Sequence, residues 1–546
     1  MRILKPMYVV AIAVATLTSC SSVKNMTVPT MDTAVSMAEK KETVGDEQFK
    51  HWAHADLVTD TIPGISLDKA YQFLEGKTGE TVIVAVIDSG IDIEHEDLKD
   101  VLWTNPKEIA GNNIDDDKNG YVDDVYGWNF LGGNGVAAPE QLEITRIVAK
   151  LNNRFEGKTA ENISEEEKAD FEKYQEYLEA YTNASKNHFN TMERLAQIEG
   201  VMNSVKEFVG KEDLTIEDLK AIKTDDVAIQ GQANGLIGMF NNGFDEKAFN
   251  DYYDNQKRNK NYDLNFDGRA IVGDNPEDIT DVNYGNGFVI GSKDVESHGT
   301  HVAGIILASR NNNIGMQGVA HNAKLMSVRA VPDGDERDKD VALAIRYAVD
   351  NGAKVVNMSF GKSYSPHRHW VIDAIKYAEK HDVLLVHAAG NSSEDIDVKD
   401  NWPNDSYDKI NEVADNVLTI GAMSVNYNEK LPASFTNYGQ KNVDVFGPGV
   451  QIYSTVPKNE YAKFSGTSMA SPEVAGIATL VRSYYPQLSA SQVKHIIMNS
   501  GTKLDLDVLV PGKKDEKVNF STLSISGKVA NAYNALVLAD KMVNGK

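Results

Sequence analysis

The sequence is poor in cysteine, and this limits the chemistry open to it. Its 546 residues include a single cysteine, Cys20, so no disulfide can form within one chain. A zinc site built from thiolates is excluded for the same reason. A cysteine nucleophile would have to be Cys20, whose N-terminal surroundings indicate a different role.

Basic residues are also in deficit. The chain has 55 Lys and Arg against 80 Asp and Glu, which gives a formal net charge of −25. A nucleic-acid partner requires a basic surface, so we expect none. The charge balance suits an enzyme exposed to solvent, and equally a protein that holds cations, and it does not by itself fix a function.

Long apolar runs are scarce as well. The run over residues 7–17 follows two basic residues, as in a secretory signal. It is shorter than the roughly 20 apolar residues that a spanning helix needs. The run ends in LTSC, which resembles the lipobox of bacterial lipoproteins. We therefore expect 1–20 to be a lipoprotein signal peptide and Cys20 to be acylated, anchoring the protein in the cell envelope, at a bacterial outer membrane. An ordinary signal peptide is the alternative.

Periodicity along the remaining chain predicts one main fold. Residues 21–61 are polar and irregular, and we expect a tether there, followed by a domain over 62–546. Runs of β-branched residues are typical of strands covered on both faces, and helical patterns lie between them. The alternation predicts an α/β fold with a parallel sheet flanked by helices. The expected strands are 81–87, 324–329, 353–358, 383–388 and 417–420, and helices are expected at 338–350 and 371–381.

One region departs from this alternation. Residues 139–249 are rich in Glu, Lys, Ala and Asn at helical spacing, which indicates a helical insertion. Two interpretations stay open for it: a plain spacer, or a device that restricts access of substrates.

Three segments each place a reactive side chain at the end of a strand or the start of a helix. They are VAVIDSGID with Asp88, SHGTHVAGI with His298 and FSGTSMASP with Ser468. Taken singly, each residue is more often a cap, a turn former or a structural histidine. Taken together, they follow the Asp, His, Ser order of subtilisin, whereas chymotrypsin-like and α/β-hydrolase enzymes use other orders.

These three motifs resemble the signatures of the subtilase family over roughly 62–539, and further residues follow from that resemblance. VVNMSFG at 355–361 resembles the substrate-lining strand, and AAGN at 388–391 resembles the segment whose asparagine, Asn391, completes the oxyanion hole. The resemblance implies a serine endopeptidase acting on proteins or peptides through an Asp88, His298 and Ser468 triad and an acyl-enzyme. The substrate-binding residues that it implies are Ser359, Phe360, Gly361, Ala389 and Gly390.

Three features depart from the usual pattern of the family. Asp88 and His298 lie 210 residues apart, against about 30 in subtilisin, and Glu473 stands where the family often has histidine. The stretch between Cys20 and Asp88 is too short for a full inhibitory pro-domain. Two alternatives to a general endopeptidase remain: a catalytically inactive binding protein with this fold, and a narrow-specificity processing protease gated by the insertion.

Two acidic stretches are candidate calcium sites. Residues 115–126 begin like an EF-hand loop but end in Tyr126 instead of glutamate, and 263–274 end in aspartate. Similar acidic loops in subtilases bind calcium, and a solvated acidic turn is the alternative. The expected ligands are Asp115, Asp117, Asn119 and Asp123 in the first stretch, and Asp263, Asn265, Asp267 and Asp274 in the second.

Overall fold

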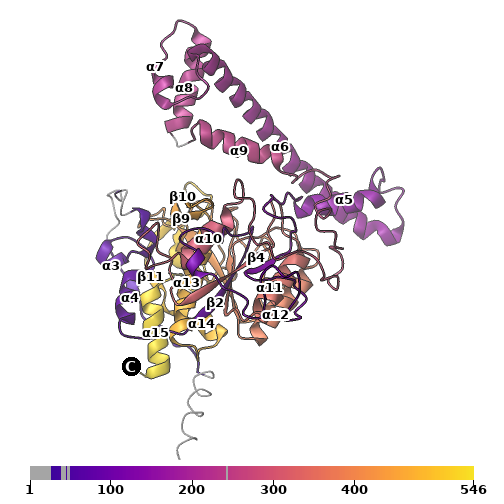
Figure 1. Ribbon diagram of the computed structural model, residues 1–546. Helices are drawn as coiled ribbons and strands as arrows, with labels where there is room; N and C mark the ends of the chain where they lie inside the picture. Colours follow the sequence, from indigo (N-terminus) through magenta and orange to yellow (C-terminus); the bar gives the residue numbers. More distant parts are fainter. Residues whose placement is uncertain (1–25, 38–44, 46–48, 242–243, 546) are drawn as a thin grey trace, which may run out of the picture. The chain divides into compact units, whose positions relative to one another are not determined.

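The computed structural model describes residues 26–37, 45, 49–241 and 244–545 (Figure 1). They fall into two units: the first comprises the described residues of 1–137, 269–331 and 336–546, and the second comprises 138–268 and 332–335. The expected signal peptide and Cys20 lie outside the described residues. Within the described part of the chain, no helix combines the length and apolarity that a membrane crossing requires.

The first unit is built on a ten-stranded, mostly parallel sheet, which confirms the predicted α/β fold. Its strand order is β1-β11-β14-β8-β7-β6-β5-β2-β4-β3, and every neighbouring pair is parallel except β11 and β14. The strands are β1 (Ala34–Val35), β2 (Val82–Asp88), β3 (Gly127–Asn129), β4 (Ala323–Arg329), β5 (Val355–Met358), β6 (Leu384–Ala388), β7 (Val417–Met423), β8 (Val445–Pro448), β11 (Thr502–Leu504) and β14 (Lys528–Val529).

Helices cover both faces of this sheet. Successive side chains of a strand point to opposite faces, and β2 shows this: Val84 and Val86 belong to one apolar cluster, and Ala85 and Ile87 belong to the other. The helices of the first unit are α3 (Leu57–Asp60), α4 (Leu67–Leu74), α10 (His298–Leu307), α11 (Asp338–Asp350), α12 (Arg368–Lys380), α13 (Thr467–Tyr484), α14 (Ala490–Ser500) and α15 (Ala532–Asn544), with short 3₁₀ turns η1 (Trp52–His54), η2 (Lys99–Val101) and η4 (Phe520–Thr522).

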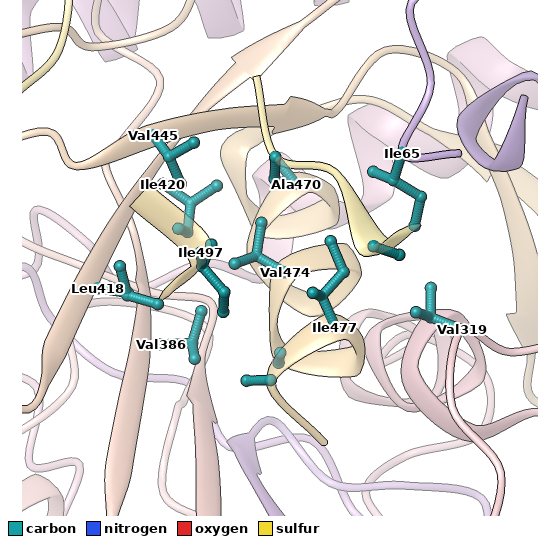
Figure 2. Close-up of a cluster of buried hydrophobic side chains, with 14 of the residues drawn as sticks. Ile65, Val319, Val386, Leu418, Ile420, Val445, Ala470, Val474, Ile477 and Ile497 are labelled. Carbon is teal, nitrogen blue, oxygen red and sulfur yellow. The ribbon is translucent and has the colours of Figure 1, made fainter. Parts of the chain in front are cut away.

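Helix α13 is the central element of the larger cluster. It contributes Ala470, Val474 and Ile477, all at 0% exposure, to a core shared with the sheet and with Ile497 of α14 (Figure 2). Truncating one of these isoleucines to alanine costs about 2–5 kcal/mol of stability in a typical core. The helix that carries Ser468 is therefore fixed along most of its length. Two small hairpins complete the unit, β9 (Ile452–Val456) with β10 (Glu460–Phe464) and β12 (Asp507–Leu509) with β13 (Lys517–Asn519).

The polar tether predicted over 21–61 is wrong for the described residues of that segment. β1 pairs with β11 in the sheet, and the Trp52 indole is 1% exposed and donates to the Val450 carbonyl at 3.2 Å. Asp56 caps α3 by accepting from the N–H groups of residues 58 and 59. A few apolar residues in a polar segment are enough to attach it, because each one buries its side chain against the main core.

The second unit is helical, as the insertion was expected to be, and extends past the predicted boundary to residue 268. One helix of this unit, α6 (Lys168–Val209), spans 42 residues, and no proline interrupts it. The unit has two apolar clusters of its own, one around Phe155 and one around Phe249. Its elements are α5 (Glu143–Phe155), η3 (Glu165–Glu167), α6 (Lys168–Val209), α7 (Ile216–Ala221), α8 (Val227–Asn241) and α9 (Glu246–Arg258).

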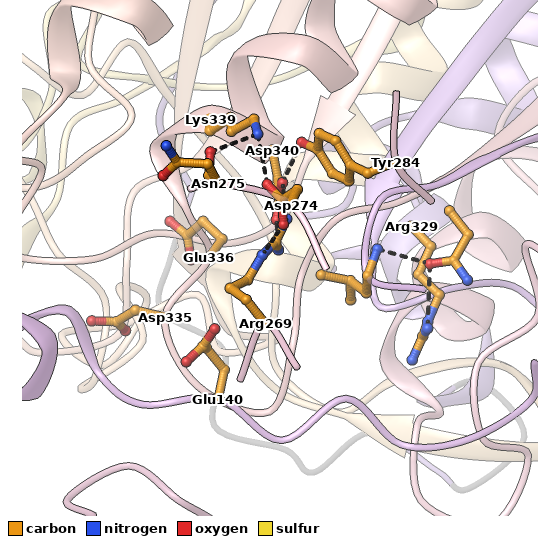
Figure 3. Close-up of polar contacts among 12 residues, drawn as sticks. Glu140, Arg269, Asp274, Asn275, Tyr284, Arg329, Asp335, Glu336, Lys339 and Asp340 are labelled. Carbon is orange, nitrogen blue, oxygen red and sulfur yellow. Dashed lines mark hydrogen bonds and ion pairs between the residues drawn. The ribbon is translucent and has the colours of Figure 1, made fainter. Parts of the chain in front are cut away.

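Buried charges tie residues 269–284 to α11 within the first unit (Figure 3). The Asp274 carboxylate accepts from Arg269 Nε at 2.6 Å and from Lys339 Nζ at 2.6 Å. Arg269 Nη1 also lies 2.7 Å from Asp340, which accepts from the Tyr284 hydroxyl at 2.6 Å. Because each charge has an opposite partner and hydrogen bonds, the network tolerates burial.

Candidate active site

Strand β2 and helix α10 bring Asp88 and His298 into contact. β2 ends at Asp88, which is 1% exposed, and α10 begins at His298. His298 Nδ1 lies 2.8 Å from Asp88 Oδ1, the same oxygen that accepts from the N–H of Ser89. The close approach depends on Gly299, where an added Cβ would stand 2.3 Å from the Gly90 carbonyl oxygen. The segments 210 residues apart in sequence therefore meet as the motifs predict.

Asp88 changes the acid–base behaviour of the His298 ring. Burial lowers the pKa of His298, but the negative charge of Asp88 and its hydrogen bond outweigh burial and raise the pKa above 6.5. The bond to Nδ1 leaves Nε2 of the ring facing away from Asp88. His301, by contrast, stacks on Phe464, and burial lowers its pKa to about 3. Its contacts are those of a structural histidine.

Ser468 is the second residue of α13, where backbone N–H groups have no partner within the helix. Its hydroxyl donates to the Ser359 carbonyl at 3.1 Å, and the Ser359 hydroxyl donates back to the Ser468 carbonyl at 2.9 Å. Asn357 Nδ2 in turn donates to the Ser359 hydroxyl. Among the described residues, the hydrogen-bond partner of the Ser468 hydroxyl is the Ser359 carbonyl and not His298.

The side chain of Asn391 is held through its amide oxygen, so that the amide nitrogen points away from Thr467. Asn391 Oδ1 accepts from the Thr467 N–H at 2.9 Å and from the Thr467 hydroxyl at 3.0 Å. A Cβ added at Gly466 would lie 3.5 Å from Asn391 Nδ2 and 3.6 Å from the Ser468 backbone nitrogen. The amide nitrogen of Asn391 and the backbone nitrogen of Ser468 therefore both lie close to the same point beside Gly466.

The expected substrate-lining residues follow the carboxyl ends of β5 and β6. After β5, the carbonyl of Phe360 is held by His387 Nε2 at 2.9 Å, which orients Ser359 and Gly361 on either side of it. After β6, the N–H of Gly390 donates to the Thr467 hydroxyl at 3.1 Å, and the carbonyl of Ala389 accepts from Asn437 at 2.9 Å. Both segments are therefore fixed backbone, at the sheet edge where open α/β folds place their sites.

The first acidic stretch brings two of its expected ligands together. Asp115, Asp117 and Glu108 each offer an oxygen within 4.8 Å of the others. Glu108 Oε2 is buried without a hydrogen-bond partner among the described residues. Asp123 lies outside this group, because its carboxylate accepts from the N–H groups of residues 111–113. Asn119 is bonded to Asp124 through its amide nitrogen at 3.0 Å.

The second acidic stretch gives less support to a metal. The carboxylate of Asp274 is already matched by Arg269 and Lys339, so it is committed to the ionic network described above. Asp263, Asn265 and Asp267 belong to the second unit, where Asp263 accepts from the N–H of Asn265 at 3.1 Å in an ordinary turn.

Sequence reasoning missed Thr467 and Glu108. Thr467 stands inside the FSGTSMASP motif, next to Ser468, and this position was the signal that could have identified it as a site residue. Glu108 precedes Asp115 by seven residues and lies outside any loop spacing that would indicate a ligand.

The geometry agrees with the family comparison. The profile of the Subtilase family matches residues 79–521, most of the chain. The chain therefore belongs to the subtilase family, the class of subtilisin-like serine proteases.

Its relatives include a serine proteinase and a subtilisin from Bacillus. The "Thermophilic serine proteinase" of Bacillus sp. (strain AK1) is 41% identical over 218 residues, which cover 40% of this chain and 48% of that protein. Subtilisin DY of Bacillus licheniformis is 37% identical over 227 residues, which cover 40% of this chain and 77% of that protein. Among solved structures, a cold-adapted subtilisin-like serine proteinase is 28% identical to this chain. The match covers 42% of this chain and 74% of that protein, with a TM-score of 0.33.

Proposed function

We propose that this chain is a serine endopeptidase that hydrolyses peptide bonds of proteins or peptides through Asp88, His298 and Ser468. The observation that carries the proposal is the 2.8 Å contact between His298 Nδ1 and buried Asp88, beside a serine at a helix N-terminus. A carboxylate on Nδ1 fixes the tautomer in which Nε2 is free to take a proton.

The reaction would run in two halves through an acyl-enzyme. Ser468 Oγ leaves the Ser359 carbonyl, passes its proton to His298 Nε2 and attacks the substrate carbonyl carbon. The imidazolium, stabilised by Asp88, then delivers that proton to the leaving amine as the C–N bond breaks. Water attacks the resulting ester with His298 again as base, and this regenerates the Ser468 hydroxyl.

The negative charge on the substrate oxygen would be bound by the Asn391 amide and the Ser468 backbone N–H. Thr467 supports this role because it accounts for the amide oxygen of Asn391 and so directs Nδ2 into the site. Donors fixed in advance need no reorganisation when charge develops, which is why they favour the transition state over the substrate. The partners implied are extended peptides, paired with the backbone after β5 and β6.

Labelling with a fluorophosphonate tests this proposal and its main alternative, an inactive binding protein. The parent chain, with calcium present, should react at a single site that is absent in Ser468→Ala. A Ser359→Ala variant is the matched control, since it keeps the nucleophile and removes the neighbouring hydroxyl. Absence of Ser468-dependent labelling in folded protein would reject the peptidase.

We further propose that the protein is secreted and held in the cell envelope by a lipid on Cys20. The support is the sequence alone: a basic start, an apolar run over 7–17 and the LTSC that ends in Cys20. One acyl chain binds a membrane only marginally, and stable anchoring takes more than one. Metabolic labelling with a fatty-acid analogue should mark the parent protein and not Cys20→Ser; equal labelling of both would contradict the anchor.

Calcium is proposed at Glu108, Asp115 and Asp117. Three carboxylates in close proximity repel one another unless a cation is present, and calcium prefers such oxygen ligands. The buried, unpartnered Oε2 of Glu108 fits this interpretation, since a polar atom without a partner is costly. When bound, the ion would stabilise the loop that precedes β3, and no step of the reaction depends on it.

A further inference from the structure

Arg329 ends strand β4 directly beside the catalytic carboxylate. It is paired in register with Asp88 on β2, and its side chain is fully buried. The two residues that follow Arg329 donate their N–H groups to the Asp88 carbonyl at 3.0 and 3.2 Å. The end of β4 therefore holds the backbone of Asp88 from one side.

The guanidinium of Arg329 joins the Asp88 turn to the segment that leads into α10. Its Nε donates to the Ser89 carbonyl at 2.8 Å, and its Nη2 donates to both oxygens of Glu296, at 3.0 and 2.9 Å. Ser89 follows Asp88, and Glu296 precedes His298 by two residues. The remaining N–H groups are satisfied by Asn129, Gly132 and Val136.

Glu296 is fixed on its own side of this contact. Its side chain is 2% exposed, and Oε2 also accepts from the N–H of Ser292 at 2.6 Å. The pair with Arg329 is charge-balanced, as burial requires. The turn from Ser292 to Glu296 is thus locked immediately before His298, at a helix start whose N-cap, Ser297, makes no side-chain capping bond.

Glycine at position 291 allows its own backbone, the side chain of Glu296 and the carbonyl of Ser89 to lie in contact. An added Cβ there would stand 2.3 Å from Glu296 Oε2 and 2.7 Å from the Ser89 carbonyl oxygen. The Ser89 hydroxyl accepts from the N–H of Gly299 at 3.4 Å on the other side. The turn of Asp88 and the start of α10 are therefore in direct contact at these points.

We propose that Arg329 and Glu296 are positioning residues that set the distance and orientation between Asp88 and His298. This inference rests on the proposed peptidase function and deepens it. Neither side chain reaches the reacting atoms. Arg329 acts through the backbone next to Asp88, and Glu296 acts through the backbone that leads to His298. The planar fork of arginine binds two acceptors at fixed directions at once, which a lysine ammonium does not reproduce.

The test compares three variants with the parent chain. Arg329→Lys keeps the positive charge but loses the planar guanidinium that binds Ser89 and Glu296 at once. Glu296→Gln keeps the shape of the side chain but loses its negative charge. Asp274→Asn breaks the buried network with Arg269 and Lys339 and is the matched control. All are assayed at a temperature at which circular dichroism shows them folded, and turnover is expressed per active site titrated with fluorophosphonate.

A misplacement of about 1 Å costs on the order of 10²-fold in rate. Both test variants should therefore lose about 30- to 100-fold in kcat with KM within about twofold of the parent, whereas Asp274→Asn should lose stability with kcat per site unchanged. Equal kcat per site in Arg329→Lys and Asp274→Asn would overturn the inference. If the parent chain hydrolyses peptides and the two test variants turn over at the parent rate, the positioning role is rejected and the proposed peptidase function stands.

A second measurement does not require activity. In a Ser468→Ala background, the ring of His298 is titrated by NMR on selectively labelled histidine. Arg329→Lys should bring the His298 pKa down from its raised value toward that of an ordinary histidine, because contact with Asp88 loosens, and Asp274→Asn should leave it unchanged. An unchanged His298 titration in Arg329→Lys would refute the role even if the parent hydrolysed nothing.

Discussion

Asn391 Oδ1 accepts two hydrogen bonds from Thr467, one from its backbone N–H and one from its hydroxyl. Thr467 directly precedes Ser468, so the residue next to the proposed nucleophile also orients the side-chain amide of Asn391. Thr467 Oγ1 additionally accepts from the N–H of Gly390. One hydroxyl therefore links the loop after β6 to the start of α13.

Thr467→Val should lower kcat by about 5- to 10-fold, with KM little changed. Valine keeps the shape but removes a hydroxyl bond worth about 1 kcal/mol, and a loss of 1.36 kcal/mol in the transition state is tenfold in rate. Asn391→Leu should cost more, about 10²–10³ in kcat. Steady-state kinetics on a peptide substrate check both, with Thr467→Ser as the control that retains the hydroxyl. Parent-like kcat in Asn391→Leu would contradict the oxyanion role.

The pH dependence of kcat/KM should report His298. Its ring must be neutral to accept a proton, and Asp88 raises its pKa above 6.5. Activity should therefore rise with pH through an apparent pKa above that value and fall on acidification below it. Asp88→Asn removes the charge and the tautomer control, so its kcat should fall by about 10⁴. An acidic limb well below pH 6 in the parent would contradict the contact.

Glu473 should make stability fall as pH rises. It is 1% exposed in α13, its Oε2 has no hydrogen-bond partner among the described residues, and burial raises its pKa well above 4.5. Its stabilising contribution is fully present below pH 4.5, where both states are protonated. As pH rises from there toward the folded-state pKa, the unfolded chain ionises and the folded protein does not, so that stability is lost.

Glu473→Gln should therefore raise the free energy of unfolding at pH 8 by about 1–3 kcal/mol and change it little at pH 4. Denaturant unfolding at the two pH values, in a Ser468→Ala background to prevent autolysis, gives the comparison. A glutamine variant that is less stable than the parent at pH 8 would show that Glu473 is ionised and partnered.

Calcium should raise the melting temperature of the parent and of Asp263→Asn, but not that of Glu108→Gln. Stabilisation by a bound ion reaches about 2.7 kcal/mol at a hundred times its dissociation constant. Thermal unfolding with calcium and with a chelator measures it. Equal calcium responses in the parent and Glu108→Gln would remove this site, and loss of the response only in Asp263→Asn would move it to the second stretch.

The sheet was predictable because buried strands leave a simple mark. The β-branched runs at 81–87 and 324–329 correspond to β2 and β4, and helix 338–350 is α11 to the residue. The first described residues were not predictable in the same way. Trp52 and Leu57 stand in a segment of mixed polarity, and only their packing in the larger apolar cluster shows that they are buried.

Some residues of the candidate site could be predicted from the sequence and others could not. Asp88, His298, Ser468 and Asn391 could be located because each lies in a long motif. Arg329 and Glu296 could not, since a charged residue becomes a positioning residue only through partners distant in sequence. Whether the insertion is a spacer or a gate stays a prediction, and deletion of 139–249 with paired protein and peptide substrates would distinguish the two roles.

The pairing of β1 with β11 has a consequence for how the chain folds. Thr33 bonds to the carbonyl of Gly501, 468 residues further along, and Ala34 is in register with Lys503. Among the described strands β1 pairs with β11, so it lacks this partner during synthesis until residues 502–504 have emerged. Contacts of such separation form slowly, and an unpaired edge invites association with other chains. Pairing of β1 is thus a late step that has to follow synthesis of β11, and it completes this edge of the sheet.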